Sequence, residues 1–454
     1  MSSLAFELKL ILRSRLTLAA LLLLLALSAV AVWSGLHEVE RQRQTIARVQ
    51  PLGEQDVASV AKRYPDSPDG GQPAYYTFYT TWDAPSDAAF MALGLRDVAP
   101  YVMRVRALGL QAQLHEGETF NPELALAGRF DYAFVLIYLA PLFVIALLHD
   151  LVSGERQSGR LRLLLSLPGG AGLWYRRVGL RALAIFACLA LPLLGAALAA
   201  GMPPAGLALA LAVTAAYLAF WTGLSVLVGT RGWHSVANAT ALMGSWAVLT
   251  LVLPALANVA LTRAIPVHQG VELMLAQRQA VHGAWEVPRD QTMRRFLAGH
   301  PEWRDTAPLP ARFHYKWYFA FHQLGDESVA AQAEAYRAGL AARQEWTRRL
   351  GWVLPGGGAQ ALLHRLAGTD LPAQLAYQDR IADFHREIRT FYYGYLFKDR
   401  PFGQADYAKR PVFAPPAPEP ELPWAGLAGT GMLGLAVLGL GLARLQRLRL
   451  LARE

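Results

Sequence analysis

Six apolar runs, each about as long as a bilayer is thick, alternate with polar segments along the chain. They cover residues 16–34, 131–149, 182–200, 206–228, 236–261 and 424–443. A run of roughly 18 or more apolar residues can cross the hydrocarbon core of a membrane as a helix. The pattern therefore predicts an all-α polytopic membrane protein with six transmembrane helices.

Arginines gather on one side of these predicted spans. They are concentrated in residues 1–15, 150–181 and 444–454, and the two long remaining segments are residues 35–130 and 262–423. Basic loops stay on the cytoplasmic side of a membrane. We therefore expect both termini in the cytoplasm and two large extracytoplasmic insertions, mainly helical in an α or α+β arrangement.

Local patterns give these segments a coarse structure. Residues 1–15 alternate apolar and charged positions at helical spacing, typical of an amphipathic helix lying at the membrane surface. The first apolar run is interpreted as an anchor, with a cleaved signal peptide as the alternative. Outside, we expect a strand within residues 75–82, a flexible turn at Gly356, Gly357 and Gly358, and helices at residues 37–63, 272–281, 327–350, 359–367 and 374–391.

Composition narrows the function classes. The chain has 454 residues, 54% of them hydrophobic, a formal net charge of +9 and one cysteine, Cys188, which lies in a predicted span. The outside parts must therefore fold without an intramolecular disulfide. The arginines of the inside segments account for the positive charge, so nucleic acid is not an expected partner.

The sequence contains none of three common catalytic or nucleotide-binding motifs. It has no GxxxxGK[ST] loop for ATP phosphates, no HExxH zinc motif and no GxSxG nucleophile turn. Methionines and histidines of the outside segments are scattered rather than spaced as metal ligands. We therefore expect no catalytic, cofactor-binding or metal-binding residues in this chain.

Aromatic residues of the outside segments fall in three blocks, at residues 75–82, 313–321 and 391–397. They could line a cleft that contacts a ligand or partner, lie at the membrane interface, or pack in the core of a disulfide-free domain. The pattern leaves all three open. The candidates for ligand or partner contact are Tyr76, Trp82, Trp317, Tyr318, Tyr392 and Tyr393.

The basic segment 150–181 carries the most specific pattern. An acidic residue, a glycine, a leucine run and a proline follow one another there: Glu155, Gly159, Leu163, Leu164, Leu165 and Pro168. This segment resembles the first cytoplasmic loop of ABC-2-type transporter permeases. Residues 121–143 resemble one branch of that family, named for a domain of unknown function, with large extracytoplasmic loops and related to the permease of copper-enzyme maturation.

The resemblance implies a complex. In that family the loop binds a separate ABC ATPase subunit, present in two copies, which carries ATP and magnesium. It implies a second permease, identical or homologous, and a bacterial inner membrane. The docking residues would be Glu155, Gly159, Leu163, Leu164, Leu165, Pro168, Arg176 and Arg177. Without the resemblance, the arginines equally suit an ordinary cytoplasmic loop.

Two other functions remain open. ATP hydrolysis in the partner could move the extracytoplasmic domains so that they act on a periplasmic protein, with nothing crossing the membrane. The nearly uncharged spans and the large outside mass favour this mechanotransmission. A ligand-sensing membrane receptor is the third possibility and would need a cytoplasmic signalling domain.

Overall fold

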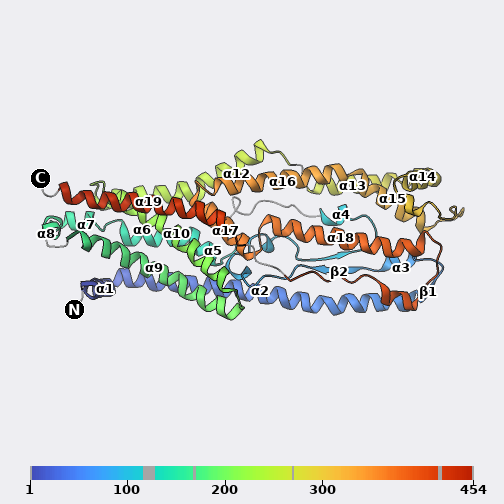
Figure 1. The fold of residues 1–454 in the computed structure, drawn as a ribbon, viewed down its shortest axis with the longest axis horizontal. Coiled ribbons are helices and arrows are strands. Elements are labelled where there is room, and N and C mark those ends of the chain that lie inside the picture. The colour runs from blue at the N-terminus through green and yellow to red at the C-terminus, as the bar shows by residue number, and fades with distance from the viewer. Residues whose placement is uncertain (1–2, 116–127, 167–169, 268–269, 418–421, 452–454) are drawn as a thin grey trace.

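The computed structural model describes residues 3–115, 128–166, 170–267, 270–417 and 422–451 of an elongated, mainly helical molecule (Figure 1). Within these ranges, six segments are long and apolar enough to cross a membrane. The prediction of an all-α, multi-pass membrane protein is therefore confirmed. The six segments are α2 (Arg15–Arg63), α5–η3–α6 (Tyr132–Phe134, Val135–Leu139 and Ala140–Leu148), α9 (Gly170–Ala200), α10 (Pro204–Gly229), α11–η4–α12 (Ser235–Ala247, Val248–Val252 and Leu253–Ala264) and α19 (Trp424–Leu451).

Helix α2 joins the predicted first span to the predicted outside helix without a break. Its 49 residues correspond to about 75 Å at 1.5 Å per residue, and it runs along most of the molecule (Figure 1). Gly35 does not end the helix. It allows close approach of the short helical turn η1 (Ala89–Met91), because a Cβ at Gly35 would lie 2.0 Å from the carbonyl oxygen of Phe90.

Helices α10 and α19 pack so closely that their backbones touch. A Cβ at Gly434 would lie 2.3 Å from the carbonyl oxygen of Ala216, and one at Gly223 would lie 2.4 Å from the backbone nitrogen of Leu438. Small residues permit this approach between membrane helices, where van der Waals packing drives association. Helix α10 is accordingly one of the two most buried spans.

A π-helical turn in the second span leaves backbone carbonyl groups that accept hydrogen bonds from side chains of neighbouring spans. Pro141 has no N–H, so the carbonyl of Ile137 has no partner four residues on. The Tyr217 hydroxyl on α10 donates to that carbonyl at 2.9 Å, and the Trp246 ring N–H on α11 donates to the carbonyl of Tyr138 at 3.2 Å. These bonds link three spans inside the bundle.

Helix α17 (Pro355–Ala367) begins with the glycines that we expected to form a flexible turn, and that prediction is wrong. Gly356, Gly357 and Gly358 are buried in its first turn. A Cβ at Gly358 would lie 2.3 Å from the carbonyl oxygen of Gly351, so this glycine serves close packing. The helix packs against α10 and α19 and shares their core.

The remaining mass, which we call the distal domain, comprises residues 36–115, 270–354 and 368–417. Two small antiparallel sheets pair β1 with β4 and β2 with β3, with Tyr79 opposite Val105 and Trp82 opposite Val102. The strand expected within residues 75–82 is observed only in β2, because residues up to Tyr76 are helical. The elements are α3 (Gly71–Tyr76), α4 (Gln111–Leu114), α13 (Gly270–Gly283), α14 (Arg289–Gly299), α15 (Tyr315–Ser328), α16 (Ala330–Leu350), α18 (Leu371–Leu396), β1 (Asp66–Ser67), β2 (Tyr79–Trp82), β3 (Val102–Val105) and β4 (Phe402–Gly403).

Candidate functional sites at the two ends of the molecule

The predicted docking segment forms a compact elbow at one end of the spans. Helices α7 (Ser153–Gln157) and α8 (Leu161–Ser166) follow the second span. The turn between them passes through Gly159 at φ +72°, a left-handed conformation that favours glycine. Helix α1 (Ser3–Arg13) and both ends of the described chain lie at this same end, which we call the basic end (Figure 1).

Arg177, near the start of α9, holds the elbow together. Its Nη1 donates to Glu155 Oε1 at 2.9 Å, and its Nε donates to Glu7 Oε2 at 3.1 Å. The Arg177 side chain is 14% exposed and that of Glu155 is 18% exposed. One guanidinium therefore joins α1, α7 and α9, in the forked geometry that suits arginine for carboxylates.

Glu155 is therefore occupied within the chain, although we expected it to contact a partner. Its second oxygen lies 2.9 Å from Nε of Arg160. With both oxygens paired, the carboxylate orders the elbow and does not offer a free charge. Arg177, another predicted contact, has the same internal role, and Arg176 is half-buried.

A second loop braces α7 from the other side. The Ser153 hydroxyl lies 2.8 Å from the Ser235 hydroxyl, which donates to Gln157 Oε1 at 3.2 Å. The Arg156 guanidinium donates to the carbonyl of Trp233, just before α11. The elbow is thus tied both to α9 and to the start of α11.

Helix α8 divides the predicted leucine run between two environments. Leu164 and Leu165 pack against the core of the spans, whereas Leu163 is 65% exposed. Arg162 beside it is exposed as well. Pro168 lies outside the described residues. Of the predicted docking residues, Leu163 is the apolar side chain that the elbow presents outward.

Three of the six predicted aromatic contacts are core residues of the distal domain. Trp317, Tyr392 and Tyr393 are buried. The Tyr79 hydroxyl donates to the Tyr392 hydroxyl at 2.9 Å, and burial raises the pKa of Tyr393 to about 12. These three side chains therefore fill the core of a domain without disulfides, which is one of the three alternatives that the sequence pattern left open.

The other three predicted aromatics retain some exposure. Tyr76 is partly exposed and its ring stacks on Tyr64, 5.1 Å between centroids. Trp82 packs its edge against Phe413, and Tyr318 packs against Trp285. Each also belongs to an aromatic cluster, so the structure brings none of them together as one open cleft.

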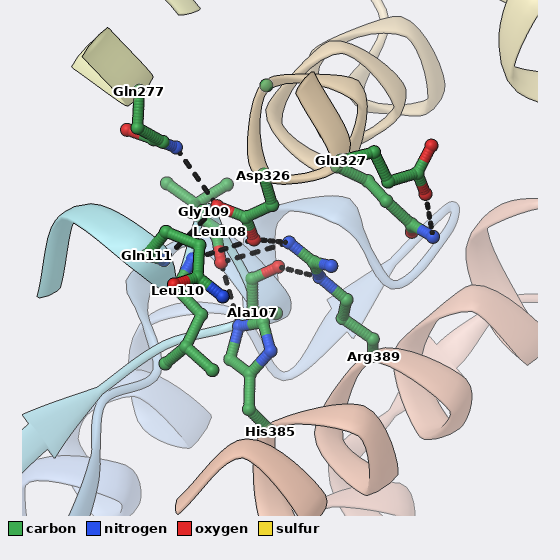
Figure 2. Close-up of polar contacts among 12 residues, drawn as sticks. Ala107, Leu108, Gly109, Leu110, Gln111, Gln277, Asp326, Glu327, His385 and Arg389 are labelled. Carbon is green, nitrogen blue, oxygen red and sulfur yellow. Dashed lines mark hydrogen bonds and ion pairs between the residues drawn. The ribbon is translucent and has the colours of Figure 1, made fainter. Parts of the chain in front are cut away.

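A network of polar contacts that sequence patterns did not indicate fixes residues 107–111 in the distal domain (Figure 2). Asp326 Oδ2 accepts the backbone N–H of Leu110 at 2.8 Å and an Nη2 hydrogen of Arg389 at 2.7 Å. Its Oδ1 accepts the N–H of Gln111 at 3.2 Å and the amide of Gln277 at 3.1 Å. We call this network the Asp326 clamp. It joins both outside insertions.

His385 completes the clamp from α18. Its Nε2 lies 2.7 Å from the carbonyl oxygen of Leu108 and 3.0 Å from that of Arg106, so this nitrogen carries the proton. Burial lowers the pKa of His385 to about 3, and the nearby Arg389 charge acts in the same direction. The ring is therefore a neutral structural donor.

Comparisons with known proteins find one similarity, to a family model that covers part of this domain. A family model described as a domain of unknown function (DUF3526) matches residues 271–415, which include α13, α15 and α18. Searches of curated proteins and of solved structures give no match. Within the described ranges, no three His, Cys, Asp or Glu side chains gather closely enough to hold a metal ion.

Proposed function

We propose that this chain is the membrane-spanning permease subunit of an ABC transporter, driven by a separate ATPase that docks on the elbow at the basic end. The observation that carries the proposal is Leu163, 65% exposed on a short helix whose base is fixed by ion pairs. A rigid base lets an apolar side chain transmit force from a partner instead of folding away.

The orientation follows from charge. Arginines of the elbow, of the chain start and of the end of α19 lie at the basic end (Figure 1). The positive-inside rule places that end, and both termini, in the cytoplasm. A bacterial inner membrane, with the distal domain in the periplasm, accords with this proposal.

The assembly contains two ATPase subunits, which bind ATP and magnesium, and a second permease, identical or homologous. The span α11–η4–α12 supports a lateral partner, because only 11% of its most apolar window is buried within the chain. This face contacts lipid, the second permease or both. The chain itself is not the enzyme in this proposal.

Affinity purification of the detergent-solubilised protein, with mass spectrometry of co-purifying proteins, tests the docking site. We expect an ABC ATPase with the wild type and its loss with Leu163→Asp, because a charge on α8 cannot enter an apolar groove. Val412→Asp is the matched control, since Val412 is similarly exposed at 61% but lies in the distal domain.

Both variants should keep the wild-type thermal unfolding temperature, because both side chains are exposed. An ATPase that binds the Leu163→Asp variant as well as the wild type would place docking elsewhere. A folded wild type that retains no ATPase under conditions that preserve other membrane complexes would overturn the transporter proposal.

Mechanotransmission remains the second candidate, and helix α2 is the observation that favours it. A single helix of 49 residues connects the basic end with the distal domain. Such a rod can transmit displacement without a transport path. Hydrogen exchange of the assembled complex with and without ATP separates the two proposals: mechanotransmission predicts altered protection in the distal domain, whereas transport alone predicts changes within the spans.

A further inference from the structure

A cavity of about 750 Å³ lies in the distal domain, between β3 and α4 on one side and α13, α15 and α18 on the other. Its walls come from both outside insertions. Phe78 and Arg106 belong to the first, and Trp285, His322 and Gln378 belong to the second, within the segment matched by the family model. The volume lies within the usual range of small-molecule sites.

The charged side chains that line the cavity are all positive. Among the described residues that line it, none is Asp or Glu, although the chain contains 34 of these residues. Three arginines are present instead: Arg104, Arg106 and Arg278. His282 and His322 also line the cavity, and burial lowers the pKa of His322 to about 3, so that ring is neutral. A recess with cationic groups and low-polarity walls concentrates anions.

Arg106 is the best-placed of these cations. Arg104 is engaged by Asp56 at 2.8 Å on the surface. No carboxylate pairs with Arg106 anywhere in the described part of the chain. Its guanidinium lies over the rings of Phe78 and Tyr75, 5.2 and 5.4 Å from their centroids. These rings fix its position and leave its N–H groups for an oxyanion.

Two other side chains of the cavity wall carry buried polar atoms that have no hydrogen-bond partner. Gln378 is 4% exposed, and its Oε1 accepts no hydrogen bond. Neither ring nitrogen of His322 has a partner either. Buried polar atoms are almost always bonded, so such orphaned atoms on a cavity wall indicate a ligand that supplies the missing contacts.

The Asp326 clamp keeps this wall in place. Leu108 and Gly109 line the cavity and belong to the segment that the clamp holds (Figure 2). Gln277 lines it too, and its amide donates to Asp326 Oδ1 at 3.1 Å. A wall whose residues are themselves held by hydrogen bonds to other parts of the domain can hold a ligand in one geometry.

We propose that this cavity binds a small organic anion whose carboxylate or phosphate pairs with Arg106, whose flat or hydrocarbon part lies against Phe78 and Trp285, and whose donor group bonds Gln378. The site lies in the distal domain, away from the elbow. Its existence does not depend on ATPase docking.

Calorimetric titration of the full-length protein in a non-ionic detergent tests the site with matched probes. Phenyl phosphate and benzoate carry the two anionic groups on the same ring, and benzylamine carries a cation on that ring. We expect both anions, or one of them, to bind and benzylamine not to bind. The anion that binds more tightly identifies the headgroup.

Arg106→Gln should weaken anion binding by about tenfold or more, because it removes a charged hydrogen-bond donor. Arg106→Lys keeps the charge and should retain part of the affinity. Arg294→Gln is the control, since Arg294 is 71% exposed on α14 and does not line the cavity. Gln378→Leu should weaken a probe with a donor group, such as 4-hydroxybenzoate, more than benzoate.

The proposal fails if neither anion binds the folded wild type, or if benzylamine binds as tightly as the anions. Equal anion affinity in the wild type and a folded Arg106→Gln variant also overturns it. If Arg106→Gln does not fold, the anion affinities of Arg106→Lys and Arg294→Gln still test the proposal. Arg106→Lys should bind phosphate more weakly than Arg294→Gln does, because lysine lacks the forked geometry of the guanidinium.

Discussion

Arg177 and Glu155 pair at 2.9 Å across the elbow, although 22 residues separate them in the sequence. The same guanidinium holds Glu7 on α1 at 3.1 Å. Helices α1, α7 and α9 therefore share one cation. The arrangement makes the elbow a preformed surface instead of a loose loop.

Replacing Arg177 with Gln should loosen the basic end. It leaves the carboxylates of Glu7 and Glu155 without their shared cation, and breaking a largely buried pair costs about 3 kcal/mol. We expect a lower thermal unfolding temperature and faster hydrogen exchange in α1 and α7. Arg162→Gln, which changes an exposed arginine of the same elbow, should alter neither. Unchanged exchange in α1 would contradict the role given to Arg177.

The glycines of the α10–α19 interface allow a sharper comparison within one helix. Gly434→Ala places a methyl group 2.3 Å from the Ala216 carbonyl oxygen, whereas Gly439→Ala meets nothing within 4 Å. Overpacking costs about 1–3 kcal/mol, so the first variant should lose stability. The second should match or slightly exceed the wild type, because alanine favours helix. Thermal unfolding in detergent measures both, and equal stability would argue against the close backbone contact.

The Asp326 clamp predicts a third effect. Asp326→Asn removes the charge from a group that accepts four hydrogen bonds, including one from Arg389. Leaving a buried guanidinium unpaired costs roughly 3–5 kcal/mol. Hydrogen exchange should accelerate in residues 107–111 and in α18. Glu327→Gln is the matched control, because the neighbouring Glu327 is 44% exposed and bonds Gln323 and His300 at the surface. Equal hydrogen-exchange rates in the two variants would show that Asp326 does not hold residues 107–111 and α18 in place.

The sequence predicted the spans because a bilayer demands a long apolar helix whatever its neighbours are. It could not predict which polar groups the spans and loops share. Glu155 was expected to face a partner, since a pattern shows only that an acidic residue occurs there. Its pairing with Arg177 depends on how α7 and α9 meet, which no local spacing encodes.

The distal domain shows the same limit. An aromatic block has the same sequence pattern whether it lines a cleft or fills a core. In the structure, Tyr392 and Trp317 fill the core. The glycines at the start of α17 are typical of a turn in the sequence, yet they lie in a helix, and the close packing against Gly351 requires a glycine at Gly358. The proposed anion cavity joins Arg106 with Gln378, which are far apart in the sequence, so no motif could have indicated it.

Acid should weaken the distal domain through His385. Its folded pKa of about 3 lies below the unfolded value near 6.5, so the unfolded chain binds a proton first. Stability is therefore intact above about pH 6.5 and declines as the pH falls toward 3, by about 2 kcal/mol at pH 5 for this one group. Protection of the α18 amides against hydrogen exchange, compared at pH 7 and 5 after correction for intrinsic rates, measures this loss.

His385→Gln isolates that contribution. A glutamine amide can donate to the carbonyl of Leu108 but takes up no proton, so the variant should lose about 2 kcal/mol less than the wild type between pH 7 and 5. Burial also lowers the pKa of His115 to about 4 and of His322 to about 3, so part of the acid sensitivity should remain. An identical loss in wild type and His385→Gln would show that His385 is protonated in the folded domain at pH 5.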